Sequence, residues 1–287
     1  MIWLVGNKGM LGSEVAAALA EAGQEHIGSD REVDILDPAA LAAFVRGRDI
    51  SWIVNCAAYT AVDKAEDEPE LARRLNAEGP GNLAALAAGI GGRILQLSTD
   101  YVFDGSGSRP YLEDDPVNPS GVYGKTKAEG EDRVRAACRE HVILRTAWLY
   151  GRGGSNFVLT MLRLMGSKEK IGVVADQKGT PTSAVDLARA IATVVGSAAP
   201  RFGTFHYTNL GETTWYEFAL EIQALGRERG LLVRDCAVEA LSSAQYPSKV
   251  KRPSYSVLSK ERIREAYGLK IPEWRESLAL FLKEVSI

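Results

Sequence analysis

The first half of the chain alternates short apolar runs with longer segments whose apolar residues recur at helical spacing. Apolar runs predict strands at 2–6, 25–30, 51–58, 93–99 and 141–151, and the segments between them predict helices at 10–22, 38–45, 71–88 and about 120–139. Strands and helices that alternate in this way build a parallel sheet with helices on both faces. We therefore predict an α/β fold with a doubly wound, Rossmann-like parallel sheet.

The second half has a less regular pattern. Helical spacing recurs at 155–165, 183–195 and 214–230, and a segment rich in Pro, Ser and Tyr follows at 242–256. We predict a larger domain of residues 1–150, to which about 182–200 returns. The remaining segments, 151–181 and 201–287, form a smaller C-terminal lobe, with a cleft between the two parts.

Composition excludes several classes of protein. The chain has 287 residues with 34 basic and 37 acidic side chains, and it lacks a basic tail typical of nucleic-acid binding. Its apolar runs are shorter than the roughly 18 residues of a membrane span. Three widely spaced cysteines predict reduced thiols and a cytoplasmic protein. The histidines and cysteines show no metal-ligand spacing, so we predict no metal site.

A glycine triplet directly follows the first strand and opens the first helix. Gly6, Gly9 and Gly12 stand where a backbone must turn tightly and approach a phosphate, and Met10 and Leu11 lie between the last two. The N–H groups and dipole of a helix N-terminus bind a pyrophosphate. We predict that these five residues bind a dinucleotide and that residues 1–150 form an NAD(P)-binding domain.

The end of the second strand leaves the choice of cofactor open. Asp30 can accept hydrogen bonds from the adenosine ribose, which favours NADH, whereas Arg31 can pair with a 2′-phosphate, which favours NADPH. A plain polar turn is the structural alternative. Further candidate cofactor contacts follow the second and third strands: Asp34, Ile35, Leu36, Ala57, Ala58 and Tyr59.

Candidate catalytic residues follow the cofactor loop. Tyr123 and Lys127 share one helix face, so the lysine charge is expected to lower the tyrosine pKa and make Tyr123 an acid towards a developing alkoxide. Thr99 ends the fourth strand at the ligand-binding edge of the sheet, where it would hold the reacting oxygen or simply cap the strand. Gly124 and Gly130 in the same helix predict a close approach by cofactor or backbone.

Longer strings carry a resemblance that covers essentially the whole chain. The glycine triplet, Thr99, Tyr123 and Lys127 resemble the extended short-chain dehydrogenase/reductases. Narrower strings resemble the dTDP-4-dehydrorhamnose reductase family: NCAAYTAVDKAE (55–66), STDYVFDG (98–105), VYGKTKAEGE (122–131), RTAWLYG (145–151), NFVLTMLRL (156–164), DQKGTPTSAVDLA (176–188), TTWYEFA (213–219) and KRPSYSVLS (251–259).

The resemblance implies a reaction and a substrate site. Hydride would pass from NADPH or NADH to C4 of dTDP-4-dehydro-6-deoxy-L-mannose, giving dTDP-L-rhamnose, with Tyr123 as proton donor, Lys127 lowering its pKa and binding the nicotinamide ribose, and Thr99 on the reacting oxygen. It implies a substrate-binding lobe and these substrate contacts: Thr99, Asp100, Tyr101, Trp148, Asn156, Gln177, Thr180 and Arg252. Trp148 is alternatively a lobe-contact aromatic, and Arg252 a solvated surface charge.

Alternatives remain at this level. Another nucleotide-sugar epimerase or 4,6-dehydratase of the superfamily is one, although dehydratases usually carry Glu where Tyr101 stands. A non-catalytic, NADP-binding regulatory subunit is another. The resemblance also implies a magnesium-linked dimer in some members. Glu14 fits one ligand position but Val185 occupies another, so the chain is predicted to be a monomer or a homodimer.

Overall fold

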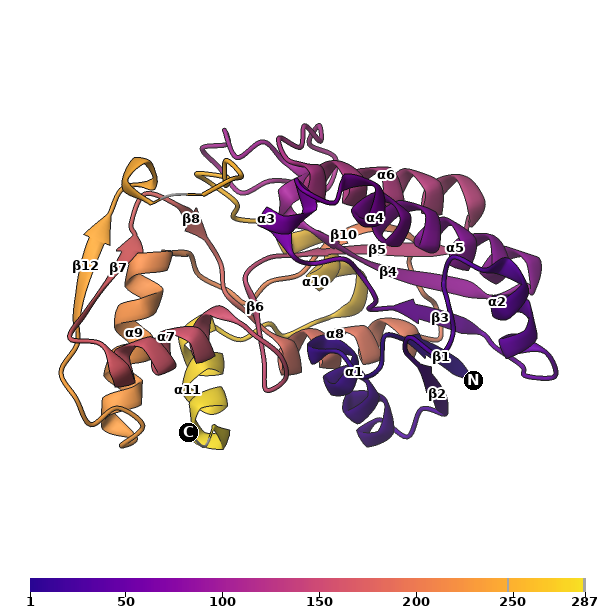
Figure 1. Ribbon diagram of the computed structural model, residues 1–287. Coiled ribbons are helices and arrows are strands. Elements are labelled where there is room, and N and C mark those ends of the chain that lie inside the picture. The colour runs from indigo at the N-terminus through magenta and orange to yellow at the C-terminus, as the bar shows by residue number, and fades with distance from the viewer. Residues whose placement is uncertain (247, 286–287) are drawn as a thin grey trace.

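The computed structural model describes residues 1–246 and 248–285 and confirms the predicted α/β fold (Figure 1). A six-stranded sheet of parallel neighbours forms its centre, in the order β10-β5-β4-β3-β1-β2. Its strands are β1 (Ile2–Val5), β2 (His26–Ser29), β3 (Trp52–Asn55), β4 (Arg93–Thr99), β5 (His141–Thr146) and β10 (Gly203–His206).

The strand order reverses between β1 and β3. From β1 the chain first adds β2 on one side, then crosses to add β3, β4 and β5 on the other. Val5 lies in register with Asn55 of β3 and with Ser29 of β2, so the carboxyl ends of the three strands are level. A crevice at such a reversal is where open α/β sheets bind ligands.

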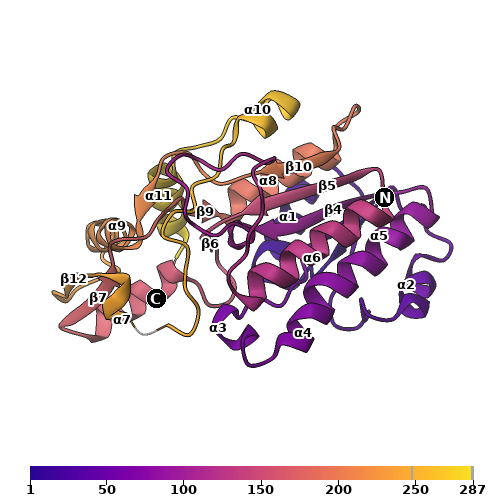
Figure 2. The same cartoon turned by 90° about the horizontal axis from the view of Figure 1, so that it is seen from above.

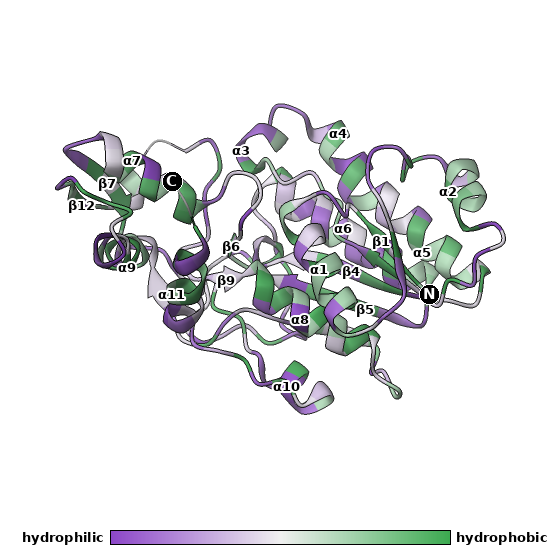
Figure 3. Cartoon of the chain, turned by 90° about the horizontal axis from the view of Figure 1, so that it is seen from below, coloured by the Kyte–Doolittle hydropathy of each residue, from purple (hydrophilic) through white to green (hydrophobic). Residues whose placement is uncertain are grey.

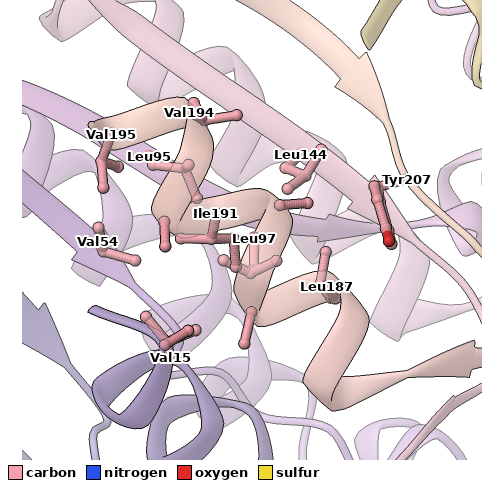
Figure 4. Packing of buried hydrophobic residues seen from close by; sticks show 14 of the residues in the cluster. Val15, Val54, Leu95, Leu97, Leu144, Leu187, Ile191, Val194, Val195 and Tyr207 are labelled. Carbon is pink, nitrogen blue, oxygen red and sulfur yellow. The ribbon is translucent and has the colours of Figure 1, made fainter. Parts of the chain in front are cut away.

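Alternating strand residues divide between the two faces of the sheet. Leu4 and Val54 pack under α1 (Met10–Glu21) and α8 (Ala184–Val195), and Figure 4 shows Val54, Leu95, Leu97 and Leu144 against Leu187 and Ile191 of α8. Trp3 and Ile53 face the opposite layer. That layer comprises α2 (Pro38–Val45), α5 (Gly79–Gly89) and α6 (Val122–Ala137) (Figure 2). Helix α8 thus packs beside α1 in the same core cluster.

The long helix expected at 71–88 contains an irregular turn. The segment is α4 (Pro69–Arg73), a π-helical turn (Arg74–Glu78) and α5, preceded by the short α3 (Val62–Ala65). Asn76 explains the irregularity, because its buried side chain hydrogen-bonds both backbone groups of Tyr59 and the Thr126 hydroxyl. π-helical turns of this kind often mark functional sites.

The second half builds a separate hydrophobic cluster at the left of Figure 1. It packs the parallel pair β7 (Lys170–Val174) and β12 (Ala237–Leu241) against α7 (Phe157–Ser167), α9 (Trp215–Glu228) and α11 (Trp274–Glu284). Two short pairs complete the second half: β6 (Leu149–Tyr150) with β9 (Thr182–Ser183), and β8 (Lys178–Gly179) with β11 (Thr213–Thr214). Figure 3 shows hydrophobic strands β1, β4 and β5 enclosed by helices of mixed hydropathy.

The sixth strand, β10, lies within 201–287, the range that the sequence placed in the lobe. Its four residues pair with β5, and Ile263 of α10 (Glu261–Tyr267) joins the α1–α8 cluster. The other predicted boundaries stay predictions. Among the residues described, none of the helices combines the length and apolarity that crossing a membrane requires.

Candidate active site

The loop between β1 and α1 requires glycine at two positions. Gly6 has φ +77°, and a Cβ there would lie 2.8 Å from the backbone nitrogen of Ala57. A Cβ on Gly12 would lie 2.0 Å from the Gly6 carbonyl oxygen. A side chain at Gly6 would push the loop away from the segment after β3, and one at Gly12 would push α1 away from the loop. Gly9 is exposed and caps α1 with ordinary backbone angles, so it leaves space beside the helix end.

The first turn of α1 offers donors for an anion. The first helical hydrogen bond runs from Ser13 N to Gly9 O at 2.9 Å, so the amides of Met10, Leu11 and Gly12 precede the regular ladder. Leu11 is buried in the core, so its own contact with a ligand would be through backbone. These donors, the dipole and the open space at Gly9 fit the pyrophosphate of a dinucleotide.

The acidic and basic candidates for cofactor selection both stand at the end of β2. Asp30 is half-buried and its amide donates to the Glu32 carboxylate at 2.9 Å. Arg31 is exposed, and Lys8 pairs with Glu32 at 3.3 Å. Because both charges stay beside the same turn, the preference between NADH and NADPH stays open.

Residues 34–36 form a tight turn above α5. Asp34 accepts a hydrogen bond from Leu36 N at 2.9 Å. Ile35 is buried, and a Cβ on Gly79 would lie 2.4 Å from its Cδ1. The Ile35 side chain therefore packs into the core, and a contact with adenine would fall to Asp34, Leu36 or the backbone.

The segment after β3 borders the glycine loop. Asn55 accepts a hydrogen bond from Ala57 N at 3.0 Å and so fixes the turn. Ala57 and Ala58 are partly exposed small residues, as a closely approaching nucleotide requires. Tyr59 donates to Glu68 at 2.7 Å, which ties its ring towards α4. Their roles as cofactor contacts stay predictions.

Thr99 and Tyr123 meet at the carboxyl edge of β4. Burial raises the pKa of Tyr123 to about 12, the nearby Thr99 side chain lowers it and the Asp100 charge raises it. The net direction is opposite to the lowering expected from Lys127. The Lys127 ammonium instead donates to the Leu97 carbonyl at 2.6 Å, and burial lowers its pKa to about 8. Tyr123 is thus held protonated at neutral pH.

The two glycines of α6 are explained by backbone contacts. A Cβ on Gly124 would lie 2.2 Å from the Tyr101 carbonyl oxygen. A Cβ on Gly130 would lie 2.0 Å from the carbonyl oxygen of Asn76, in the π-helical turn. The approach expected from the sequence is therefore made by backbone at both glycines, and it seats α6 against the turn after β4 and against the π-helical turn.

The residues after Thr99 enclose the tyrosine. Asp100 is buried and accepts from the Thr99 hydroxyl at 3.0 Å, and burial raises its pKa to about 6. The rings of Tyr101 and Tyr123 meet edge to face with centroids 5.5 Å apart. The structure thus brings Thr99, Asp100, Tyr101 and Tyr123 into one cluster. Their contacts with a substrate stay predictions.

Trp148 is held by the lobe. It has φ +48°, the left-handed region that a bulky residue seldom adopts. Its ring stacks on Trp215 with centroids 3.5 Å apart and planes 11° apart, and a Cβ on Gly179 would lie 2.5 Å from it. Trp148 therefore contacts the lobe, through Trp215 and Gly179. The ring remains partly exposed, so a sugar contact stays a prediction.

Asn156 and Thr180 make structural hydrogen bonds. Asn156 caps α7 by accepting from Leu159 N at 3.1 Å, and its Nδ2 donates to the Gly151 carbonyl at 2.8 Å. Thr180 is fully buried and donates to the Gly211 carbonyl at 2.8 Å. Both residues shape the lobe whatever they contact in a complex.

Gln177 and Arg252 lie on the lobe side of the site. Gln177 donates to Ser243 at 3.0 Å. Arg252 donates to Asp63 at 3.2 Å, and its buried Nε has no hydrogen-bond partner among the residues described. The Arg252 charge also acts on the buried Tyr101 hydroxyl. The Arg252 guanidinium is therefore held in position by Asp63, and its Nε–H remains available to donate a hydrogen bond beside Tyr101. It is not a freely solvated charge.

Sequence reasoning missed a buried charge cluster between α6 and the sheet. Glu131 accepts from Ser98 at 2.6 Å and from Arg145 at 2.8 and 2.7 Å. Arg145 gave a usable signal, because an arginine inside the apolar strand HVILRT must find a buried partner. Glu131, eight residues after Tyr123, lies on the same stripe of α6.

Comparison with known proteins agrees with this geometry. The family model described as "RmlD substrate binding domain" matches residues 1–287. The spore coat polysaccharide biosynthesis protein SpsK of Bacillus subtilis is 40% identical over 99% of this chain and 98% of its own. A dTDP-4-dehydrorhamnose reductase of Streptomyces griseus is 43% identical over 96% of this chain and 91% of its own.

A solved structure gives the same result. The dTDP-4-dehydrorhamnose reductase of Bacillus anthracis, in complex with NADP, has a TM-score of 0.92 and 34% identity, over 99% of both chains. The glycine loop lies at the sheet reversal, Tyr123 packs on Tyr101 beside Thr99, and the matches extend over both parts of the chain, so these findings agree. The chain belongs to the dTDP-4-dehydrorhamnose reductase family.

Proposed function

We propose that this chain reduces the C4 keto group of dTDP-4-dehydro-6-deoxy-L-mannose to dTDP-L-rhamnose. The observation that carries the proposal is the cluster of Thr99 and Tyr123 at the carboxyl edge of β4, in a chain of this family. NADPH or NADH supplies the hydride when bound. A relative of this chain is known in complex with NADP, which supports NADPH as one of the two.

The residues of the chain have separate tasks in this proposal. The Thr99 hydroxyl binds the reacting oxygen, and the protonated Tyr123 hydroxyl delivers the proton to it. A pKa near 12 keeps this proton in place until an alkoxide, which is more basic, develops at C4. Lys127 stabilises the phenolate that remains. Asp100, Tyr101, Trp148 and Arg252 border the sugar and diphosphate.

The test is turnover with a defined product. Purified protein is mixed with dTDP-4-dehydrorhamnose, formed in place by an upstream epimerase, and with NADH or NADPH in parallel. Loss of dihydronicotinamide absorbance with dTDP-L-rhamnose as the chromatographic product supports the proposal and identifies the preferred cofactor. Binding of a cofactor without oxidation would contradict it and favour a regulatory subunit. Formation of the C4 epimer would contradict the assigned product.

A further inference from the structure

Three ionisable residues form one stripe along α6. Tyr123, Lys127 and Glu131 are spaced by four residues and share the helix face that packs on β4. Lys127 and Glu131 are 4% and 1% exposed. Lys127 reaches β4 through the Leu97 carbonyl, and Glu131 reaches it through the adjacent Ser98 hydroxyl. The lysine and the glutamate are thus anchored to consecutive residues of one strand.

Glu131 is fixed as a carboxylate. Arg145 holds both its oxygens in a two-pronged ion pair, and Ser98 donates to one of them. Arg135, one turn further along α6, donates at 2.7 Å. Ser98 and Arg145 are direct neighbours in the β4–β5 register, so the sheet presents both donors to the helix together. Burial raises the pKa of Glu131, but the bonds and charge of Arg145 outweigh it and the net direction is downward.

The groups that face Lys127 come from three elements. Burial lowers the pKa of Lys127 to about 8, and the Glu131 charge is the largest effect that opposes it. The Cys56 thiol, after β3, also acts on Lys127, but burial raises its own pKa to about 12 and leaves it neutral. Tyr123 is neutral for the same reason, and β4 contributes the Leu97 carbonyl. The Glu131 carboxylate is therefore the anion that favours the ammonium form.

We propose that Glu131, held by Arg145 and Ser98, is a positioning residue that keeps the buried Lys127 ammonium charged beside Tyr123. The effect of this charge on turnover rests on the proposed function, whereas the charge itself does not. Without a lysine nearby, the ion pair between Glu131 and Arg145 would have a purely structural role. The four-residue spacing to Lys127 and the shared anchor on β4 give Glu131 its second task.

The direct test is a titration of Lys127 by NMR. Full-length protein is labelled with ¹³Cε-lysine, and the Lys127 signal is assigned as the one missing in Lys127→Arg. Glu131→Gln should move the Lys127 midpoint to lower pH by about one unit or more, because a nearby opposite charge is removed. An unchanged midpoint in a folded Glu131→Gln protein would overturn the proposal.

Matched variants separate charge from structure. Glu131→Asp and Ser98→Ala keep the carboxylate, so the Lys127 midpoint should stay close to that of the natural chain. Glu131→Gln leaves Arg145 buried without its partner and can unfold the protein. The double variant Glu131→Gln with Arg145→Met removes both charges and should lower the midpoint in the same direction. A lowered midpoint in Ser98→Ala as well would overturn the charge argument.

Kinetics distinguish this inference from the proposed function. If Lys127 acts as an ammonium, kcat/KM of the natural chain falls above about pH 8. This alkaline limb should move to lower pH in Glu131→Gln. If the natural chain shows no turnover but the Lys127 midpoint shifts in Glu131→Gln as expected, the proposed function is refuted and the inference about Glu131 stands. An active natural chain whose limb is unmoved in Glu131→Gln refutes the inference alone.

Discussion

At the scale of single residues, burial sets the protonation states of the site. Tyr123, Lys127 and Asp100 all have pKa values displaced towards the neutral form, and desolvation is the largest cause for each. The spacing of the residues in the sequence predicted which side chains lie close together. It could not predict how far burial displaces their pKa values, because burial depends on the strands and loops that close over the helix. Tyr123 and Lys127 illustrate this limit of sequence spacing. The spacing predicted an interaction between the two side chains, whereas the Lys127 ammonium donates its hydrogen bond to the Leu97 carbonyl.

Removal of the Tyr123 hydroxyl tests its role as acid. Tyr123→Phe should lower kcat by about 10²-fold or more, since a positioned acid contributes about 10²–10⁴-fold. The affinity for NADPH should change little, because the ring and its edge-to-face contact with Tyr101 remain. Dihydronicotinamide oxidation and a fluorescence titration measure the two quantities. A variant that keeps most of its rate would exclude Tyr123 as the proton donor.

His206 makes stability depend on pH. Burial, and then the Arg145 charge, lower its pKa to about 3. An unfolded histidine binds a proton below about pH 6.5. The unfolded state therefore binds more protons between these values, and stability falls as the pH falls through this window, by up to about 1.4 kcal/mol per unit.

The prediction for His206→Gln is a shallower loss of stability between pH 6.5 and 5. Urea denaturation at several pH values gives the free energy of unfolding for both proteins. Comparing slopes removes the contribution of other acidic groups, which both proteins share. Equal slopes would show that His206 takes up its proton in the folded state at an ordinary pH.

At the scale of elements, hydrophobic periodicity predicted the helices and strands whose positions depend on local sequence. The first four strands and the helices of the first half lie within a few residues of their expected bounds, because apolar spacing marks them. The fifth strand, expected at 141–151, is divided into β5 and the short β6, which belongs to another sheet. The π-helical turn was missed, since Asn76 bonds to Tyr59 and Thr126, far away in the chain. Strand β10 has four residues, and only its pairing with β5 marks it as sheet.

Two glycine substitutions test how closely α6 approaches the π-helical turn. Gly130→Ala would place a Cβ 2.0 Å from the Asn76 carbonyl oxygen, a fixed backbone atom. It should lower the free energy of unfolding by about 1–3 kcal/mol. Gly89→Ala is the matched control, because a Cβ there meets nothing within 4 Å, and in α5 it should be neutral or stabilising by up to about 1 kcal/mol. Equal urea midpoints for the two variants would contradict the prediction.

At the scale of the whole molecule, residue contacts join the first domain to the lobe. Arg152 follows β6 and holds both oxygens of Glu14 on α1, at 2.9 and 2.8 Å. The same guanidinium pairs with Glu284 on α11 at 3.3 Å. Glu14 is the residue that the family resemblance had suggested for a shared metal ion. Here its buried carboxylate has a partner within its own chain.

Removal of Arg152 tests this link. Arg152→Ala leaves Glu14, 6% exposed, without its main partner, and the cost is moderated because Arg152 itself is half exposed. We expect the free energy of unfolding in urea to fall by about 1–2 kcal/mol. Lys170→Ala is the control, because its 3.4 Å pair with Glu239 is open to solvent and should contribute about 0.5 kcal/mol or less. If the two variants unfold alike, water satisfies Glu14 and Arg152 does not bind the two parts together.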